Sequence, residues 1–194
     1  MPPLVPVFDL DGTLLDSDEA LVAPFVALGV AAEDITFGHT LAAECERLGL
    51  RVDDYLDHYD VDQAQPFPGA HELVAGLDRW AVCSNKHPSG GVPELARLGW
   101  EPEVALFADA FGFAGKALGP VLAELGLTAG EIVFVGDTEH DRRCAAEVAC
   151  RFVWAGWNKR VRAVDGDEVL ESPVQLTDLL GRPGALQALT PPEA

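Results

Sequence analysis

The chain has 194 residues, of which 48% are hydrophobic and 23% are charged, as is typical of a globular protein. Its formal net charge of −19 argues against an extended nucleic-acid interface and against an anionic membrane surface, because both need clustered Lys and Arg. We see no signal peptide, and no stretch reaches the ~20 apolar residues of a membrane helix. We therefore expect a cytoplasmic protein that binds neither nucleic acid nor membrane.

The first apolar run, 4–8, predicts a buried strand that ends at a pair of aspartates. Asp9 and Asp11 stand two positions apart, and Gly12 and Thr13 indicate that the chain turns after them. Two carboxylates this close repel each other unless a cation or a shared proton relieves them. Mg²⁺ would relieve the repulsion and also attract a phosphate. The alternative is an acidic strand end followed by ordinary turn chemistry.

The next segment contains no strand-like run and is too long for a simple loop. Apolar residues at helical spacing predict two helices, and 52–59 is a candidate for a third. Pro24 should kink or interrupt the first of them. The expected division of the chain is a catalytic core over 1–15 and 67–183, a small helical cap over 16–66, and a loosely ordered tail over 184–194.

The run 79–83 predicts the second strand of the core, and Ser84, Asn85 and Lys86 follow it directly. A hydroxyl and successive N–H groups at a strand end can cradle an anion, although such turns are also common without one. Further along, Lys116 stands just before a helical period. A lone lysine in that position is more often a solvated surface residue than a ligand.

The run 131–135 is the most hydrophobic of the predicted strands, and Asp137 and Asp141 follow it. Their spacing of four places both carboxylates on one face of a helix that begins there. The alternative is a pair of acidic residues that cap the helix N-terminus without a catalytic role.

Two further runs, 104–107 and 150–154, complete the pattern of short strands that alternate with helical periods. This alternation predicts an α/β fold, a doubly wound parallel Rossmann-like sheet with the small helical cap inserted after strand 1. Such sheets bind their ligands beyond the carboxyl ends of the strands. The polar clusters described above all fall at strand ends or helix starts, an order that is hard to obtain by chance.

Together these residues resemble the motifs of the haloacid dehalogenase-like superfamily, in the phosphoglycolate phosphatase-like branch with a cap after the first strand. The resemblance covers nearly the whole chain. It implies that Asp9 attacks phosphorus, and that Asp11 protonates the leaving group and then activates water. It also implies a Mg²⁺ ion bound by Asp9, Asp137, Asp141 and the main-chain carbonyl of Asp11.

The same resemblance implies a phosphate-binding set that comprises Gly12, Thr13, Ser84, Asn85 and Lys116. The prolines that often follow the lysine in this family are absent directly after Lys116, so Lys86 is a second candidate for the phosphate-binding cation. His87 and His140 border the motifs, and the sequence leaves open whether either contacts the substrate.

The sequence thus predicts a Mg-dependent phosphomonoester hydrolase that acts on a small phosphorylated metabolite through an aspartyl-phosphate, as a monomer or homodimer. Phosphoryl transfer needs positioned cations around the equatorial oxygens, which Mg²⁺ and a lysine would supply. A sugar-phosphate mutase with the same motifs and a non-catalytic phospho-ligand-binding relative remain alternatives. A signalling receiver domain is disfavoured, because its phosphorylated aspartate lies on a later strand and it has no inserted cap.

Overall fold

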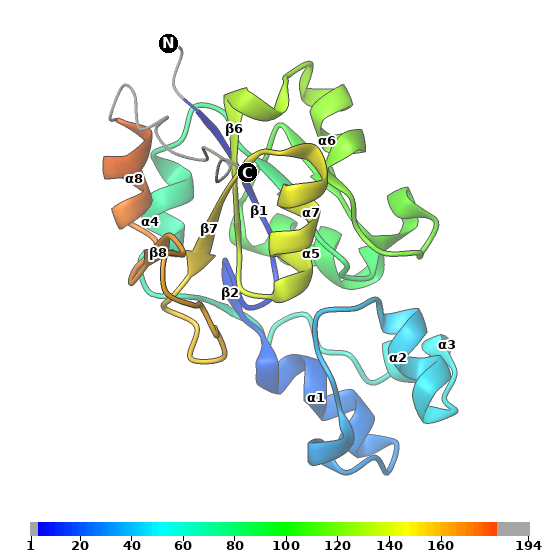
Figure 1. The fold of residues 1–194 in the computed structure, drawn as a ribbon. Helices are drawn as coiled ribbons and strands as arrows, with labels where there is room; N and C mark the ends of the chain where they lie inside the picture. The colour runs from blue at the N-terminus through cyan, green and yellow to red at the C-terminus, as the bar shows by residue number, and fades with distance from the viewer. Residues whose placement is uncertain (1–3, 182–194) are drawn as a thin grey trace.

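A computed structural model of the chain describes residues 4–181 and shows a six-stranded sheet with helices on both faces (Figure 1). The strands pair in parallel in the order β5-β4-β1-β6-β7-β8. They are β1 (Val5–Phe8), β4 (Ala81–Cys83), β5 (Val104–Leu106), β6 (Ile132–Gly136), β7 (Arg151–Ala155) and β8 (Val169–Leu170). The predicted α/β fold is confirmed, and β8 is a strand that the sequence pattern did not reveal.

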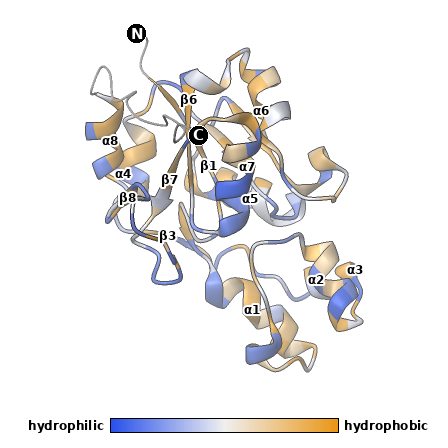
Figure 2. Ribbon diagram, in the orientation of Figure 1, coloured by the Kyte–Doolittle hydropathy of each residue, from blue (hydrophilic) through white to orange (hydrophobic). Residues whose placement is uncertain are grey.

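Helices cover both faces of the sheet, and the alternation of side chains along each strand explains why both faces are apolar. Val5 and Val7 of β1 point to one face and Phe8 to the other. The strands accordingly rank among the most hydrophobic parts of the ribbon in Figure 2. On one face lie α4 (Ala70–Ala75), α5 (Pro88–Leu98) and α8 (Gln175–Leu180), and on the other α6 (Leu118–Leu125) and α7 (Glu139–Val148).

The segment between β1 and α4 forms the predicted helical cap at one end of the sheet (Figure 1). Its elements are α1 (Asp18–Ala27), the short 3₁₀ helix η1 (Ala32–Asp34), α2 (Leu41–Leu48) and α3 (Val52–Leu56). They enclose a small apolar core of their own around Phe25, Ile35, Cys45 and Tyr55. The two chain connections run side by side as an antiparallel pair, β2 (Leu15–Asp16) with β3 (Gln65–Pro66), which fixes where the cap leaves and rejoins the core.

Of the two outcomes expected for Pro24, a kink or an interruption of the first cap helix, the interruption is wrong, because α1 runs without a break over Asp18–Ala27. Pro24 lacks an N–H and so removes one donor, but the next turn is still made: the N–H of Leu28 donates to the Pro24 carbonyl over 3.0 Å. Burial of Pro24 and Phe25 against the cap core holds the helix together at this point.

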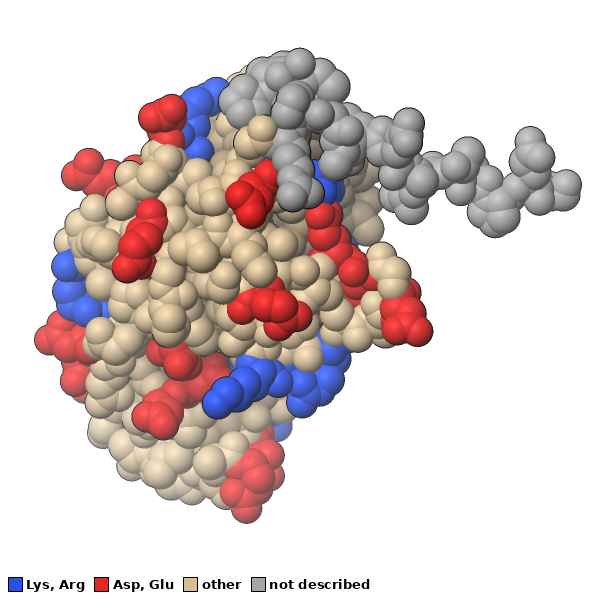
Figure 3. Space-filling model, turned by 90° about the vertical axis from the view of Figure 1, so that its left-hand side faces the viewer, with Lys and Arg blue, Asp and Glu red and all other residues tan. Residues whose placement is uncertain are grey.

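The strong negative charge marks no single site on the face shown in Figure 3. On the face shown in Figure 3, acidic side chains are scattered over the surface rather than gathered in one place.

None of the helices within residues 4–181 combines the length and the apolar character that crossing a membrane requires. The tail predicted over 184–194 lies outside the described residues.

Candidate active site

Three neighbouring strands end at the same edge of the sheet, and each is followed by a predicted site residue. Asp9 follows β1, Ser84 follows β4 and Asp137 follows β6, and all three are buried. The backbone ladder continues one residue beyond β1, since the Asp9 N–H donates to the carbonyl of Val135 over 2.9 Å. The parallel sheet therefore brings together side chains that lie far apart in the sequence.

Lys116 stands between two of the carboxylates at this edge. Its Nζ lies 2.9 Å from Asp9 Oδ2 and 2.5 Å from Asp141 Oδ1, and its side chain is almost fully buried. The second oxygen of Asp141 accepts bonds from the N–H and the hydroxyl of Thr138, at 2.9 and 2.6 Å. Asp141 thus caps helix α7 with one oxygen and pairs with Lys116 through the other.

Asp137 is also buried and is contacted from two further segments. Asn158 donates to its Oδ2 over 2.9 Å, and Nη2 of Arg160 lies 3.1 Å from the same oxygen. The hydroxyl of Thr13 approaches the other oxygen at 3.4 Å. Gly12 packs so closely that a Cβ there would stand 2.3 Å from Asp137 Oδ2, so this position has no room for a side chain.

Burial and crowding change the acidity of these groups. Burial raises the pKa of Asp9 to about 6, although Lys116 opposes that shift. Burial and the nearby Asp9 and Asp141 carboxylates raise the pKa of Asp137 well above its ordinary value. Burial lowers the pKa of the Lys116 ammonium group, but the Asp141 and Asp9 carboxylates together outweigh burial and raise that pKa. The site is therefore a strongly interacting set of charges that favours additional positive charge.

Asp9, Asp137 and Asp141 could share a metal ion. Each offers a carboxylate oxygen, and these three atoms lie within 4.8 Å of one another. All three residues are buried, and Lys116 and Arg160 bring fewer charges than the carboxylates carry. Hard oxygen ligands suit Mg²⁺. The residues present therefore fit a small divalent cation.

Ser84 and Asn85 take different positions beside this cluster. Burial has the larger effect on Asp9 and raises the pKa of its carboxyl group. The nearby hydroxyl of Ser84 opposes part of that rise. Asn85 uses both ends of its amide: Oδ1 accepts from the Lys116 N–H over 2.6 Å, and Nδ2 donates to the carbonyl of Gly38 in the cap over 3.2 Å. Asn85 thus joins the cap to the loop that carries Lys116, rather than presenting a free amide.

Lys86, the second candidate for a phosphate-binding cation, instead pairs with other residues. Its Nζ lies 2.7 Å from Asp11 Oδ1, 3.0 Å from Glu94 Oε2 and 2.9 Å from the Tyr59 hydroxyl. The Tyr59 hydroxyl in turn donates to Glu94 Oε1 over 2.5 Å. The ammonium group thus donates hydrogen bonds to Asp11 and Tyr59 and forms an ion pair with Glu94, all within the protein.

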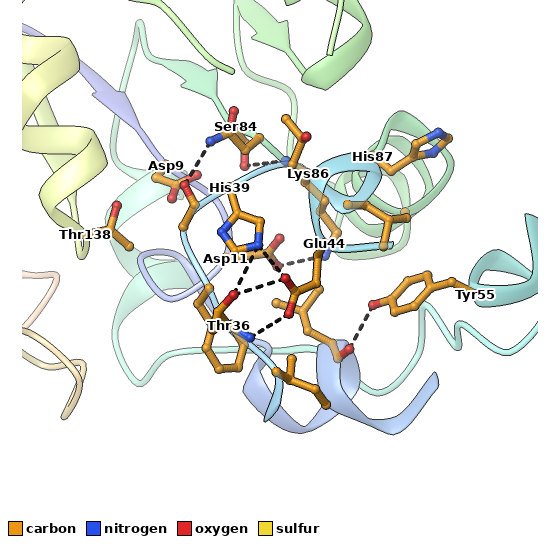
Figure 4. Close-up of a pocket in the computed structure, with 18 of the residues that line it drawn as sticks. Asp9, Asp11, Thr36, His39, Glu44, Tyr55, Ser84, Lys86, His87 and Thr138 are labelled. Carbon is orange, nitrogen blue, oxygen red and sulfur yellow. Dashed lines mark hydrogen bonds and ion pairs between the residues drawn. The ribbon is translucent and has the colours of Figure 1, made fainter. Parts of the chain in front are cut away.

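A pocket opens between this edge of the sheet and the cap (Figure 4). The cap supplies Phe25, Ile35 and Leu41 as apolar lining, together with Thr36, His39 and Glu44. Glu44 is buried and accepts from Thr36, His39 and Arg47. His87 lines the pocket as well, whereas Nε2 of His140 is buried and no hydrogen bond to it is found within residues 4–181.

Sequence reasoning missed four residues that complete the site: Asn158, Arg160, Glu94 and Tyr59. Asn158 and Arg160 carried a usable signal, because they follow the end of a predicted strand just as Ser84 and Asp137 do. Glu94 and Tyr59 carried none, since an acid within a helix and a tyrosine after one are ordinary features.

Several known proteins resemble this chain in sequence and in fold. The sequence model of the haloacid dehalogenase-like hydrolases matches residues 7–155. A phosphoglycolate phosphatase of Xanthomonas campestris pv. campestris is 29% identical, over 90% of this chain and 95% of that protein. An N-acetylmuramic acid 6-phosphate phosphatase of Pseudomonas aeruginosa is 24% identical, over 91% of this chain and 94% of that protein. A hydrolase structure from Pseudomonas syringae has a TM-score of 0.72 at 22% identity, covering 92% of this chain and 98% of that one.

Proposed function

We propose that this chain, which belongs to the haloacid dehalogenase-like hydrolases and is a phosphatase of that family, hydrolyses a small phosphomonoester through a phosphoryl group carried on Asp9. The placement of Asp9 carries the proposal. Its carboxylate lies at the end of β1, where Lys116 Nζ is 2.9 Å from Oδ2 and the Leu10 N–H donates to Oδ1 over 2.7 Å. A carboxylate held in this way is oriented for attack on a bound phosphorus.

In the first half of the reaction an Asp9 oxygen forms a bond to phosphorus, and the bond between phosphorus and the leaving oxygen breaks. Asp11, which stands two residues further at the pocket, gives its proton to that leaving oxygen. In the second half Asp11 takes a proton from water, the water oxygen bonds to phosphorus, and the Asp9 carboxylate is released. The same group therefore acts first as an acid and then as a base.

The cations of the site act on the charge of the transferring group. Lys116 would neutralise part of the charge on the phosphoryl oxygens, and Ser84 and the turn at Gly12 and Thr13 would contribute hydrogen bonds. Asp9, Asp137 and Asp141, with the Asp11 carbonyl, would hold Mg²⁺. When bound, that ion would supply charge neutralisation for an incoming phosphate.

The cap residues over 16–66 would close the pocket and select the leaving group. The two relatives described above are named for different phosphomonoesters, phosphoglycolate and N-acetylmuramic acid 6-phosphate. We therefore assign this chain to small phosphorylated metabolites as a class.

Phosphate release from a panel of monoesters, with and without Mg²⁺, tests the proposal. Activity should require Mg²⁺ and stop in excess chelator. The Asp9→Asn variant should fall below about a thousandth of wild-type turnover while keeping its fold, because an amide is a poor nucleophile. Asp165→Asn, the same change at an exposed aspartate, is the control and should retain full activity. Retention of more than about a tenth of turnover in Asp9→Asn would exclude the covalent route, and an isomerised sugar phosphate instead of free phosphate would indicate a mutase.

A further inference from the structure

We infer that Lys86, itself held by Glu94 and Tyr59, is a positioning residue that orients the Asp11 carboxylate toward the leaving group and ties its orientation to the cap. This inference rests on the proposed phosphatase function, because it assigns Asp11 the role of proton donor. It replaces the expectation that Lys86 binds the substrate phosphate.

The contacts of Lys86 are those of a fixed support rather than of a free cation. Its ammonium group donates to Asp11 over 2.7 Å and to Tyr59 over 2.9 Å, and it forms an ion pair with Glu94 at 3.0 Å. The side chain of Lys86 is 3% exposed and that of Glu94 is 0% exposed. The charge of a lysine enclosed in this way is already balanced by Asp11 and Glu94, so Lys86 is poorly suited to bind a phosphate oxygen as well.

The arrangement leaves one oxygen of Asp11 available. Within residues 4–181, the hydrogen bonds recorded for this carboxylate are confined to Oδ1, which Lys86 holds. The Asp11 side chain is 17% exposed and lines the pocket. An acid whose Oδ1 is fixed can rotate little about its side-chain bonds, so Oδ2 stays directed at the substrate side.

Stability alone does not account for this cluster. Taking a lysine and a glutamate out of water is costly, and a buried ion pair is often no more stabilising than apolar residues of the same volume. The backbone nevertheless leaves room for the cluster of Lys86, Glu94 and Tyr59. A Cβ at Gly90 would stand 3.1 Å from Lys86 Cε and 3.2 Å from a Tyr59 ring carbon, so the glycine lets α5 approach the pair closely.

Tyr59 connects the support to the cap. It follows α3 in the segment that returns to the core, and its ring stacks on Tyr55 with centroids 5.9 Å apart. Tyr55 is buried in the cap core, and its hydroxyl donates to the carbonyl of Leu21 in α1 over 3.0 Å. A movement of the cap that carries Tyr59 away would remove a partner from both Lys86 and Glu94, and so loosen Asp11.

The test exploits leaving groups that need a proton to different degrees. An alkyl monophosphate releases an alkoxide, which must be protonated as it departs, whereas 4-nitrophenyl phosphate releases a stable phenolate that needs no proton. For a covalent mechanism, kcat/KM reports only on steps up to departure of the leaving group. The ratio of kcat/KM for glycerol 2-phosphate to that for 4-nitrophenyl phosphate therefore isolates Asp11 as an acid.

In Lys86→Met, kcat/KM for glycerol 2-phosphate should fall by ~10²-fold or more, and for 4-nitrophenyl phosphate by less than ~10-fold, since general acid catalysis contributes about 10²–10⁴. The inhibition constant of inorganic phosphate should change by less than about threefold, because Lys86 does not hold the phosphate. Tyr59→Phe, which removes one hydroxyl and keeps the ring, should show the same selective loss at a smaller size. Val92→Ala, which shortens an exposed side chain of the same helix, is the control and should keep the wild-type ratio.

Equal losses of kcat/KM with both substrates in Lys86→Met and in Tyr59→Phe would overturn the inference. An inhibition constant of inorganic phosphate that rises ~10-fold or more in Lys86→Met would also overturn it, because that is the signature of a residue that binds phosphate. If Lys86→Met does not fold, Tyr59→Phe alone decides through the same ratio. A wild-type protein that releases phosphate from neither ester refutes the proposed function instead, so the two failures are distinguishable.

Discussion

The ammonium nitrogen of Lys116 lies 2.5 Å from Oδ1 of Asp141, and both side chains are withdrawn from solvent. The same nitrogen lies 2.9 Å from Asp9 Oδ2, so one lysine serves two buried carboxylates. Asp137 is the third carboxylate of the cluster, and Arg160 is its cationic partner at 3.1 Å. Three acids thus face two bases, which leaves a net negative charge that a bound cation would balance.

Lys116→Met should destabilise the metal-free protein by ~3–5 kcal/mol, because removal of one partner leaves buried carboxylates without compensation. Added Mg²⁺ should then raise the Tm of the variant by more than it raises that of the wild type, since a cation replaces the missing charge. Thermal unfolding in chelator and in Mg²⁺ measures both effects. Arg79→Met, which removes an exposed pair with Glu103, is the control and should lose little stability. If Lys116→Met and Arg79→Met have the same Tm in chelator, this account of the cluster is wrong.

Gly12→Ala should weaken Mg²⁺ binding at least ~10-fold. Gly12 has a φ of +77°, and its added Cβ would also meet Asp137 Oδ2 at 2.3 Å. Gly49→Ala is the matched control, because Gly49 has a φ of +70° and its Cβ would meet nothing within 4 Å. Both variants share a backbone cost of about 1–2 kcal/mol, and only the first displaces a proposed metal ligand. Titration of Mg²⁺ by calorimetry separates them, and equal affinities would contradict the prediction.

Glu44→Gln should reduce stability at neutral pH and have progressively less effect in acid. Burial raises the pKa of Glu44, but hydrogen bonds from Arg47, Thr36 and His39 outweigh burial and lower it to about 2. The folded pKa is below the ordinary value of 4.5, so the ionised group stabilises the fold above about pH 4.5 and loses that contribution as the pH falls toward 2.

Urea unfolding at several pH values measures this contribution, which we expect to be roughly 2–3 kcal/mol at pH 7. Glu46→Gln, an exposed glutamate on the same helix, should show almost no loss at any pH. A stability difference between wild type and Glu44→Gln that is the same at pH 7 and pH 3 would show that the carboxylate charge is not involved.

Asn85→Ala should loosen the cap where it meets the core. The amide of Asn85 joins the Gly38 carbonyl at 3.2 Å to the Lys116 N–H at 2.6 Å, and its loss leaves that buried N–H unsatisfied at a cost of about 1–3 kcal/mol. This cost lowers the free energy needed to open the cap loop 35–40. The backbone amides of that loop should therefore exchange hydrogen at least ~10-fold faster. Asn158→Ala removes three hydrogen bonds but none to the cap, so it should leave exchange in this loop unchanged. Faster exchange in both variants would point to general loosening instead.

The sequence by itself determined the sheet and the positions of its polar ends. Short apolar runs are a local signal, and they are enough to place Asp9, Ser84 and Asp137 at strand ends. Because parallel strands end at one edge, those three positions had to meet once the strand order was set. The cap helices were predictable in the same way, because α1, α2 and α3 follow the apolar spacing of the segment between the first two core strands.

Only the tertiary structure decided which charges pair. Lys86 stands in sequence beside Ser84, which favours a place at the phosphate, yet it meets Asp11, Glu94 and Tyr59. Asn158 donates to the carbonyl of Gly12, which lies far away in the sequence. Arg160 forms ion pairs with both Asp137 and Asp18. A buried charge takes the partner that packing brings within hydrogen-bond distance, because leaving it unpaired in a low-dielectric interior costs several kcal/mol. That choice depends on how α5, the cap connection and the loop after β7 pack together, and no local pattern of residues records it.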